Sequence, residues 1–142
     1  MSDLSRREQG LSLNWTVSQA GTNRNVIPAQ ATAQGDARAL KVSDFTELEA
    51  TLQQRVKTQR IPDAKVQLRF EMRRPPLEAT PAARRLAAHG AAIYAELGLP
   101  LKVLDVATGG GTDAAFAALK TAAPVIEGFG LSSYGAHSND AE

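Results

Sequence analysis

Two stretches of the chain alternate apolar and polar residues with a period of two, and they constrain the fold more than any other feature. The first covers residues 11–18, LSLNWTVS, and the second covers residues 65–73, KVQLRFEMR. Such alternation is typical of a β-strand with one buried face. The residues predicted to face inward are Leu11, Leu13, Trp15, Val17, Val66, Leu68, Phe70 and Met72.

A helix is predicted between these strands, from Ser43 as its cap to about Gln59. Apolar residues recur there at intervals of three and four and form one stripe, made of Phe45, Leu48, Leu52 and Val56. Residues 25–38 are predicted to form a weaker strand, with Pro28 near its start or on an edge. The order β-β-α-β predicts an antiparallel sheet with one face covered by a helix.

A change of composition follows at residues 73–81, RRPPLEATP, which we interpret as a domain boundary. It divides the chain into residues 1–75 and 76–142. Thr80 and Pro81 are predicted to start a second helix as cap and first residue. Its predicted buried side consists of Leu86, Gly90, Ile93 and Leu97.

The remaining segment has the texture of an α/β fold. We expect a short strand at 101–106, a glycine loop, a helix from Thr112 to about Lys120, and a strand at 123–127. The fold class predicted for the whole chain is therefore α+β in its first part, followed by an α/β piece.

Composition excludes several classes of function. Sixteen basic and fifteen acidic residues leave a formal charge of +1, so we expect neither a nucleic acid nor a membrane as a partner. The chain has no cysteine, which excludes disulfides and thiolate metal sites. This composition fits a bacterial cytoplasm or periplasm and does not choose between them.

The glycine loop, Gly109 to Ala114, fits the dinucleotide fingerprint G-x-G-x-x-G/A. A dinucleotide-binding domain is therefore one alternative. Against it, the Asp113 carboxylate would repel a pyrophosphate bound at the same helix end, and the predicted helix is short for a dinucleotide crossover. The glycines could also serve only close packing of a strand against a helix.

Longer motifs around the loop resemble a known family. They are GGGTDAAFAAL at 109–119, PVIEGFGL at 124–131 and YGAHSNDAE at 134–142, with GTNRNVIPA at 21–29 continuing to Asp36-Ala37-Arg38. Together they resemble the zinc-dependent glutamate carboxypeptidases of the aminoacylase/carboxypeptidase metallopeptidases, from about Leu11 to Glu142. The resemblance implies a partial dimerisation (lid) domain over 1–75 and a C-terminal piece of the catalytic domain over 76–142.

The resemblance also implies roles for individual residues. The residues implied to bind the substrate are Asn25, Arg38, Arg74, Gly109, Gly110, Gly111 and Thr112. His137 matches the family's C-terminal zinc ligand, and Glu142 matches an acid that follows it. His89 lies in the second predicted helix without a partner motif, and no function is assigned to it.

The implied reaction is hydrolysis of an amide bond to a C-terminal glutamate-like residue by zinc-activated water. A catalytic zinc needs about three protein ligands, and at most one, His137, is expected here. We therefore expect a fragment that is inactive by itself and comes from a homodimeric enzyme whose substrates carry a C-terminal carboxylate. The alternative from another class is a non-catalytic dimerisation or interaction module with an exposed pairing edge.

Overall fold

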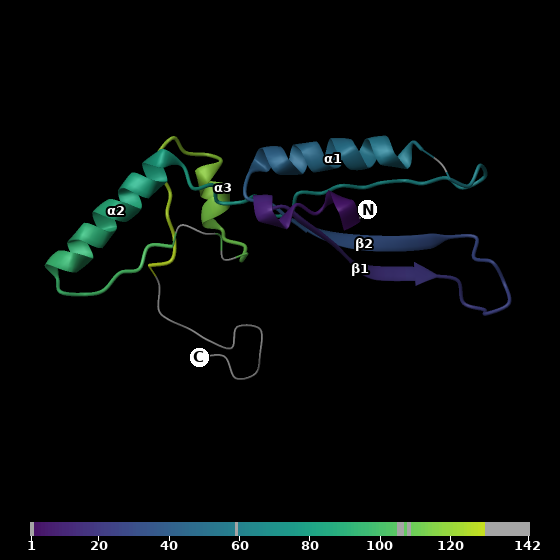
Figure 1. Cartoon of the computed structure of the whole chain (residues 1–142), viewed down its shortest axis with the longest axis horizontal. Coiled ribbons are helices and arrows are strands. Elements are labelled where there is room, and N and C mark those ends of the chain that lie inside the picture. The colour runs from purple at the N-terminus through teal and green to yellow at the C-terminus, as the bar shows by residue number, and fades with distance from the viewer. Residues whose placement is uncertain (1, 59, 105–106, 108, 130–142) are drawn as a thin grey trace.

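The computed structural model describes residues 2–58, 60–104, 107 and 109–129. Two short 3₁₀ turns, Ser2–Leu4 and Arg7–Gln9, precede the larger elements, and Figure 1 shows an elongated molecule. The larger elements are β1 (Ser12–Ala20), β2 (Ala31–Arg38), α1 (Val42–Val56), α2 (Pro81–Glu96) and α3 (Ala114–Ala118). The mixed α+β class predicted from the sequence is confirmed. Within the described ranges, no helix is long and apolar enough to cross a membrane.

Strands β1 and β2 form an antiparallel ribbon. Ser12 lies opposite Arg38 at one end of the ribbon, and Ala20 lies opposite Ala31 at the other. The register shifts between Trp15 and Val17, so one extra residue bulges from β1. A bulge bends a strand and changes the direction of the side chains that follow it. Trp15 and Val17 are 45% and 41% exposed, so the prediction that both face inward is wrong.

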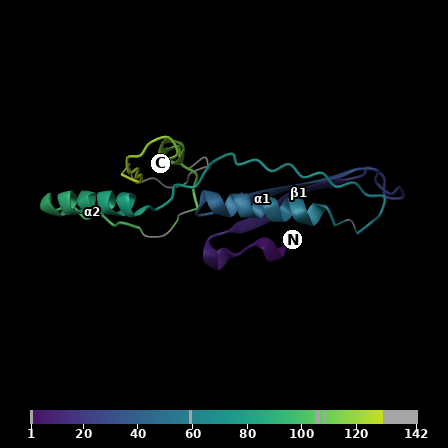
Figure 2. The same cartoon turned by 90° about the horizontal axis from the view of Figure 1, so that it is seen from above.

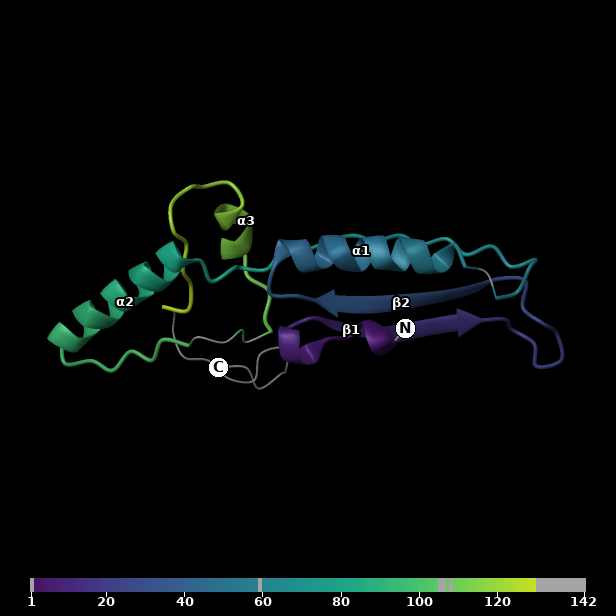
Figure 3. The same cartoon turned by 45° about the horizontal axis from the view of Figure 1, so that its top comes forward.

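Helix α1 lies along one face of this ribbon, as Figures 2 and 3 show from two directions. Its apolar stripe points at the ribbon, and three stripe residues, Phe45, Leu48 and Leu52, are buried. The core cluster consists of Leu11, Leu13, Leu48 and Leu52. The period-three-and-four pattern therefore predicted the buried face of α1 correctly.

The cap of α1 differs from the prediction. The helix begins at Val42 after Lys41, and the structure shows no side-chain cap on the preceding residue. The Val42 N–H instead donates to Glu78 Oε1 at 2.9 Å. Because a free N–H at a helix start can be satisfied by any nearby acceptor, a residue distant in sequence replaces the local cap predicted at Ser43.

Residues 65–73 form no strand, which corrects the third predicted strand. They run extended beside α1, back toward the start of that helix (Figures 1 and 2). Leu68 and Phe70 pack against the core cluster, and the Phe70 ring lies 6.3 Å from the Phe45 ring. Val66 and Met72 are 56% and 42% exposed. The alternation thus produced apolar contacts on one side without a hydrogen-bonded ladder.

Helix α2 begins as predicted, with the Thr80 hydroxyl accepting the Ala83 N–H at 3.1 Å and Pro81 in the first turn. Its predicted buried side is wrong in part, because Ile93 is 44% exposed and Leu97 is 66% exposed. The contacts that this helix does make involve Gly90 and Tyr94. Phe129 lies over Gly90, where an added Cβ would be 3.0 Å from the ring, and Tyr94 contacts the same ring at 6.0 Å.

The remaining expectations for the second part of the chain are also corrected. Residues 101–104 and 123–127 belong to no strand, and α3 covers five residues rather than the nine predicted from Thr112 to Lys120. The single ladder in the part of the chain that the structure describes is the β1–β2 ribbon. Without a neighbouring strand to pair with, these apolar runs remain irregular.

Candidate functional site

The glycine loop leads directly into α3. Gly109 has a φ of +80°, a left-handed conformation that glycine adopts without steric cost. The Thr112 hydroxyl accepts the Ala114 N–H at 3.1 Å and so satisfies one free donor at the start of α3. Since α3 has only five residues, few peptide dipoles align behind the loop. Any anion binding here must therefore depend on side-chain charge.

Arg38 supplies one such charge from the end of β2. Its Nη1 donates to the carbonyl oxygen of Gly109 at 2.8 Å, and its Nε donates to Asp36 Oδ2 at 2.9 Å. Both distances are typical of well-formed hydrogen bonds. Arg38 therefore connects the end of the ribbon to the glycine loop, 71 residues further along the chain.

This contact fixes the direction of one peptide group in the loop. The described chain contains no cis peptide bond, and in a trans peptide the carbonyl and the following N–H point in opposite directions. Because the Gly109 carbonyl faces Arg38, the Gly110 N–H faces away from Arg38. The Gly110 N–H and the Arg38 guanidinium therefore lie on opposite sides of this peptide group.

Arg74 supplies the second charge, from the extended segment after residue 73. Its Nη1 lies 3.3 Å from Asp113 Oδ1. A Cβ added to Gly111 would lie 2.9 Å from Arg74 Cδ, a separation that is too close for a real side chain. Glycine at this position thus lets the Arg74 arm lie against the loop.

The structure therefore brings together six of the seven predicted substrate-binding residues: Arg38, Arg74, Gly109, Gly110, Gly111 and Thr112. Asn25 is the exception. It lies in the connection between β1 and β2, at the end of the ribbon far from Arg38 (Figure 1). Seven residues separate Ala31 from Arg38, which corresponds to about 23 Å of strand. Within one chain Asn25 is therefore separate from the loop.

Two carboxylates at this site were not predicted to take part in it. Asp36 and Asp113 each accept a hydrogen bond from one of the arginines. The sequence offered a signal for Asp36, because residues two apart on a strand point to the same face. Asp113 is 39 residues from Arg74, and no local pattern predicts that contact.

The free hydrogen-bonding capacity of the site belongs to the arginines. A guanidinium has five N–H donors, of which Arg38 uses two and Arg74 uses one in the contacts above. Among the described residues, no further acceptor contacts either guanidinium. Their side chains are 63% and 57% exposed. Both groups can therefore reach a ligand that arrives from solvent.

No zinc centre can be built from the described part of the chain. Among those residues, no group of three or more histidine, aspartate or glutamate side chains is placed to hold a metal ion. The predicted ligand His137 and its neighbour Glu142 lie outside the described residues. His89 is exposed on α2. We therefore derive no catalytic step through a metal from this structure.

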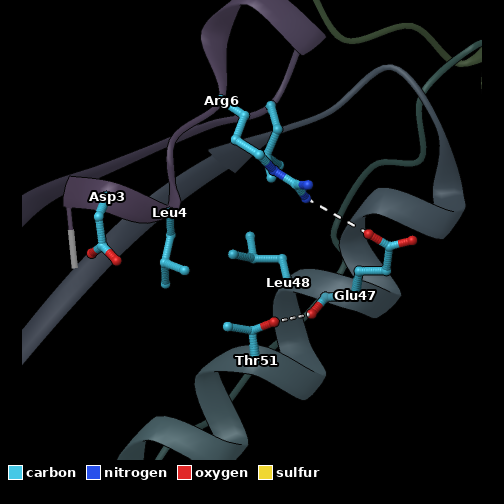
Figure 4. Close-up of a pocket in the computed structure, with 7 residues that line it drawn as sticks. Asp3, Leu4, Arg6, Glu47, Leu48 and Thr51 are labelled. Carbon is cyan, nitrogen blue, oxygen red and sulfur yellow. Dashed lines mark hydrogen bonds and ion pairs between the residues drawn. The ribbon is translucent and has the colours of Figure 1, made fainter.

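A hollow between the first 3₁₀ turn and α1 is the other candidate site (Figure 4). Its volume is about 280 Å³, and it is lined by Asp3, Leu4, Arg6, Leu11, Glu47, Leu48 and Thr51. Its charged groups already have partners. Arg6 lies 3.6 Å from Glu47, and Arg55 donates to both oxygens of Asp3. These pairings leave no convergent charge for a ligand.

The Asp3–Arg55 pair also changes the ionisation of both groups. The hydrogen bonds from Arg55 hold the pKa of the Asp3 carboxyl well below its usual range. The same hydrogen bonds raise the pKa of Arg55. This pair therefore ties the first turn to α1 and does not contribute a titrating group to a site.

Comparison with known proteins finds two matches to this chain. Residues 1–64 match the family model described as a peptidase dimerisation domain. Over 136 residues, 96% of this chain, the sequence is 40% identical to carboxypeptidase G2 of Pseudomonas sp. (strain RS-16). The chain belongs to the carboxypeptidase G2-like peptidases. It spans 32% of the length of carboxypeptidase G2.

The dimerisation-domain match covers only some of the candidate site residues. The dimerisation-domain match contains β1, β2 and α1, and so it includes Asn25 and Arg38. Arg74 and the glycine loop lie beyond residue 64.

The dinucleotide alternative gains no support, because the described sheet is an antiparallel ribbon rather than the parallel sheet that such a domain requires.

Proposed function

We propose that this chain forms part of a zinc-dependent carboxypeptidase and that its glycine loop binds the carboxylate of a C-terminal glutamate-like residue. One observation carries the proposal: Arg38 and Arg74 come from separate elements and meet at the loop. The 40% identity to a carboxypeptidase supports the reaction class. The substrate would be an amide such as an N-acylglutamate.

The chemistry of the two arginines suits this role. A guanidinium can hold a carboxylate through two parallel charge-assisted hydrogen bonds. The loop would add backbone N–H donors. In the whole enzyme, zinc would activate the attacking water. His137 is the one ligand that this chain is proposed to supply, and one ligand cannot hold a catalytic metal.

The position of Asn25 suggests a second copy of the chain in the complete site. Within one chain about 23 Å of strand lies between Ala31, at the Asn25 end of the ribbon, and Arg38 at the loop. If Asn25 contacts substrate, a neighbouring copy must bring it there. The dimerisation-domain match supports the proposal of a homodimer.

Ligand binding tests this function directly. We expect N-acetyl-L-glutamate to shift the amide resonances of residues 109–112 in an NMR titration of the chain. Arg74→Gln should remove most of the response, because the charge opposite the ligand is lost. Arg69→Gln is the matched control, since Arg69 is an exposed arginine paired only locally with Glu71. Resonances that do not move at saturating ligand would contradict the proposal.

A second assay tests the proposed inactivity of the isolated chain. With zinc added, the purified chain should release no glutamate from an N-acylglutamate. Turnover that His137→Ala abolishes would contradict this expectation and would show that the chain holds a competent metal by itself.

A purely structural role is the second candidate, because the family model matched in residues 1–64 is a dimerisation domain. This role predicts self-association without ligand binding. Light scattering after size exclusion would show a dimer while the titration above remains flat. A strict monomer at high concentration would argue against it.

A further inference from the structure

We infer that Asp113 sets the affinity of the proposed carboxylate site by competition: it occupies Arg74 in the free protein, and a ligand carboxylate must displace it. This role depends on the function proposed above. It adds to that function a residue that acts by competing with the ligand. Three features of the structure lead to it.

The first feature is the weakness of the contact. A single Nη1 of Arg74 approaches a single oxygen of Asp113, at 3.3 Å. The two side chains are 57% and 91% exposed. Exposed ion pairs are screened by water and contribute little to stability. A second carboxylate that binds in the bidentate geometry would therefore replace Asp113 readily.

The second feature is that the Asp113 side chain does not cap α3. It holds the N-cap position of α3, yet its backbone is helical and its side chain makes no capping hydrogen bond. The neighbouring Thr112 hydroxyl accepts the Ala114 N–H instead. Moving the Asp113 side chain away from Arg74 therefore costs the helix no hydrogen bond.

The third feature is the difference between the two arginines. Arg38 makes two hydrogen bonds of 2.8 and 2.9 Å, one of them to the loop backbone, so releasing it would disturb the loop. The Arg74 arm rests against Gly111, and only its tip contacts Asp113. Arg38 thus positions the loop, whereas Arg74 is the charge that can change partners.

Competition of this kind sets the affinity of the site. A ligand carboxylate replaces one negative partner of Arg74 with another, so the charge of the arginine stays compensated. The cost of releasing Asp113 is the same for every ligand that takes its place on Arg74. Asp113 therefore lowers the affinity of all such ligands by the same factor.

The test is an NMR titration of N-acetyl-L-glutamate into the wild-type chain and two variants. Asp113→Asn should bind about two- to fivefold more tightly at low salt. The gain should shrink in high salt, because screening weakens the competing pair. Asp63→Asn removes the same charge from an exposed turn remote from the loop in sequence, and we expect it to match the wild type.

A double variant separates competition from a general change of charge. When Arg74→Gln is present, adding Asp113→Asn should give no gain, because the two residues act on each other. Wild-type binding with an Asp113→Asn affinity equal to or weaker than that of the Asp63→Asn control overturns this inference and leaves the proposed function standing. Absence of binding by the wild type and every variant overturns the proposed function and this inference together.

Discussion

The two halves of the molecule both contain many apolar residues but bury them very differently. In the N-terminal half, α1 lies over the β1–β2 ribbon, and Leu11, Leu13, Leu48 and Leu52 meet in one cluster. Among the described residues of the C-terminal half, the buried apolar ones are two alanines, Ala83 and Ala115. Several of its large apolar side chains, among them Ile93, Leu97 and Leu119, are 44% to 66% exposed.

The difference shows that an apolar stripe becomes a core only when a second surface faces it. The α1 stripe has the ribbon on one side and the extended segment with Leu68 and Phe70 on another. Helix α2 has comparable apolar positions, but the described residues give it no sheet to cover. Burial therefore follows the arrangement of elements and not the sequence of one element alone.

The largest expected effect comes from shortening the same residue type in each half. Leu52 is 3% exposed and Leu97 is 66% exposed. Leu52→Ala should lower the free energy of unfolding by about 2–5 kcal/mol, because it leaves a cavity in the cluster. Leu97→Ala should change it by no more than about 0.5 kcal/mol. Urea unfolding followed by circular dichroism measures both.

Equal losses for these two variants would contradict the comparison. That result would mean that α2 is covered in solution by a surface absent from the described residues, such as a second copy of the chain. Repeating the unfolding at several protein concentrations separates this case, because the stability of a dimer depends on concentration.

A smaller effect is expected at the start of α2, where local hydrogen bonding takes the place of a core. Thr80→Ala removes the hydroxyl that accepts the Ala83 N–H at 3.1 Å. We expect α2 to lose about 1 kcal/mol of stability. Thr80→Ser keeps the hydroxyl and is the matched control. Amide hydrogen exchange in α2 should accelerate in the alanine variant alone, and unchanged exchange would argue that packing holds this helix.

The smallest effect concerns the edge of the N-terminal half, where Asp3 pairs with Arg55. Since Arg55 lowers the pKa of Asp3, the stabilisation is fully present above the unfolded pKa of about 3.9 and is lost progressively as the pH falls from there through the lower folded pKa. Asp3→Asn should therefore melt slightly lower than the wild type at neutral pH. The two melting temperatures should converge in acid, and a difference that persists there would contradict the assignment.

Several features of the fold could be read from the sequence because local chemistry determines them. The α1 stripe, the Thr80 cap and the pairing of the first two strands follow from spacing, hydroxyl position and alternation. The strand predicted at 65–73 is wrong, because alternation indicates one buried side and does not say whether that side belongs to a paired strand or to an extended segment beside a helix. The prediction of a Ser43 cap for α1 is wrong for a similar reason, since the acceptor of the Val42 N–H is Glu78, 36 residues away.

The candidate site could also be predicted only in part. Motif resemblance identified Arg38, Arg74 and the glycines, and the structure brings them together. It could not show that Asp113 contacts the Arg74 guanidinium, because that contact depends on how distant segments meet. His137 stays a prediction, since it lies outside the described residues.

The exposure of the Arg74–Asp113 contact also has a consequence for how quickly the site responds. Exposed side chains change rotamer on the order of picoseconds to nanoseconds, and exchanging one carboxylate for another on Arg74 requires only such a change. No backbone movement has to precede it, because Arg38 already holds the loop in place. Asp113 would then reduce the fraction of time in which Arg74 is free to accept a ligand, and association would slow in proportion to that fraction.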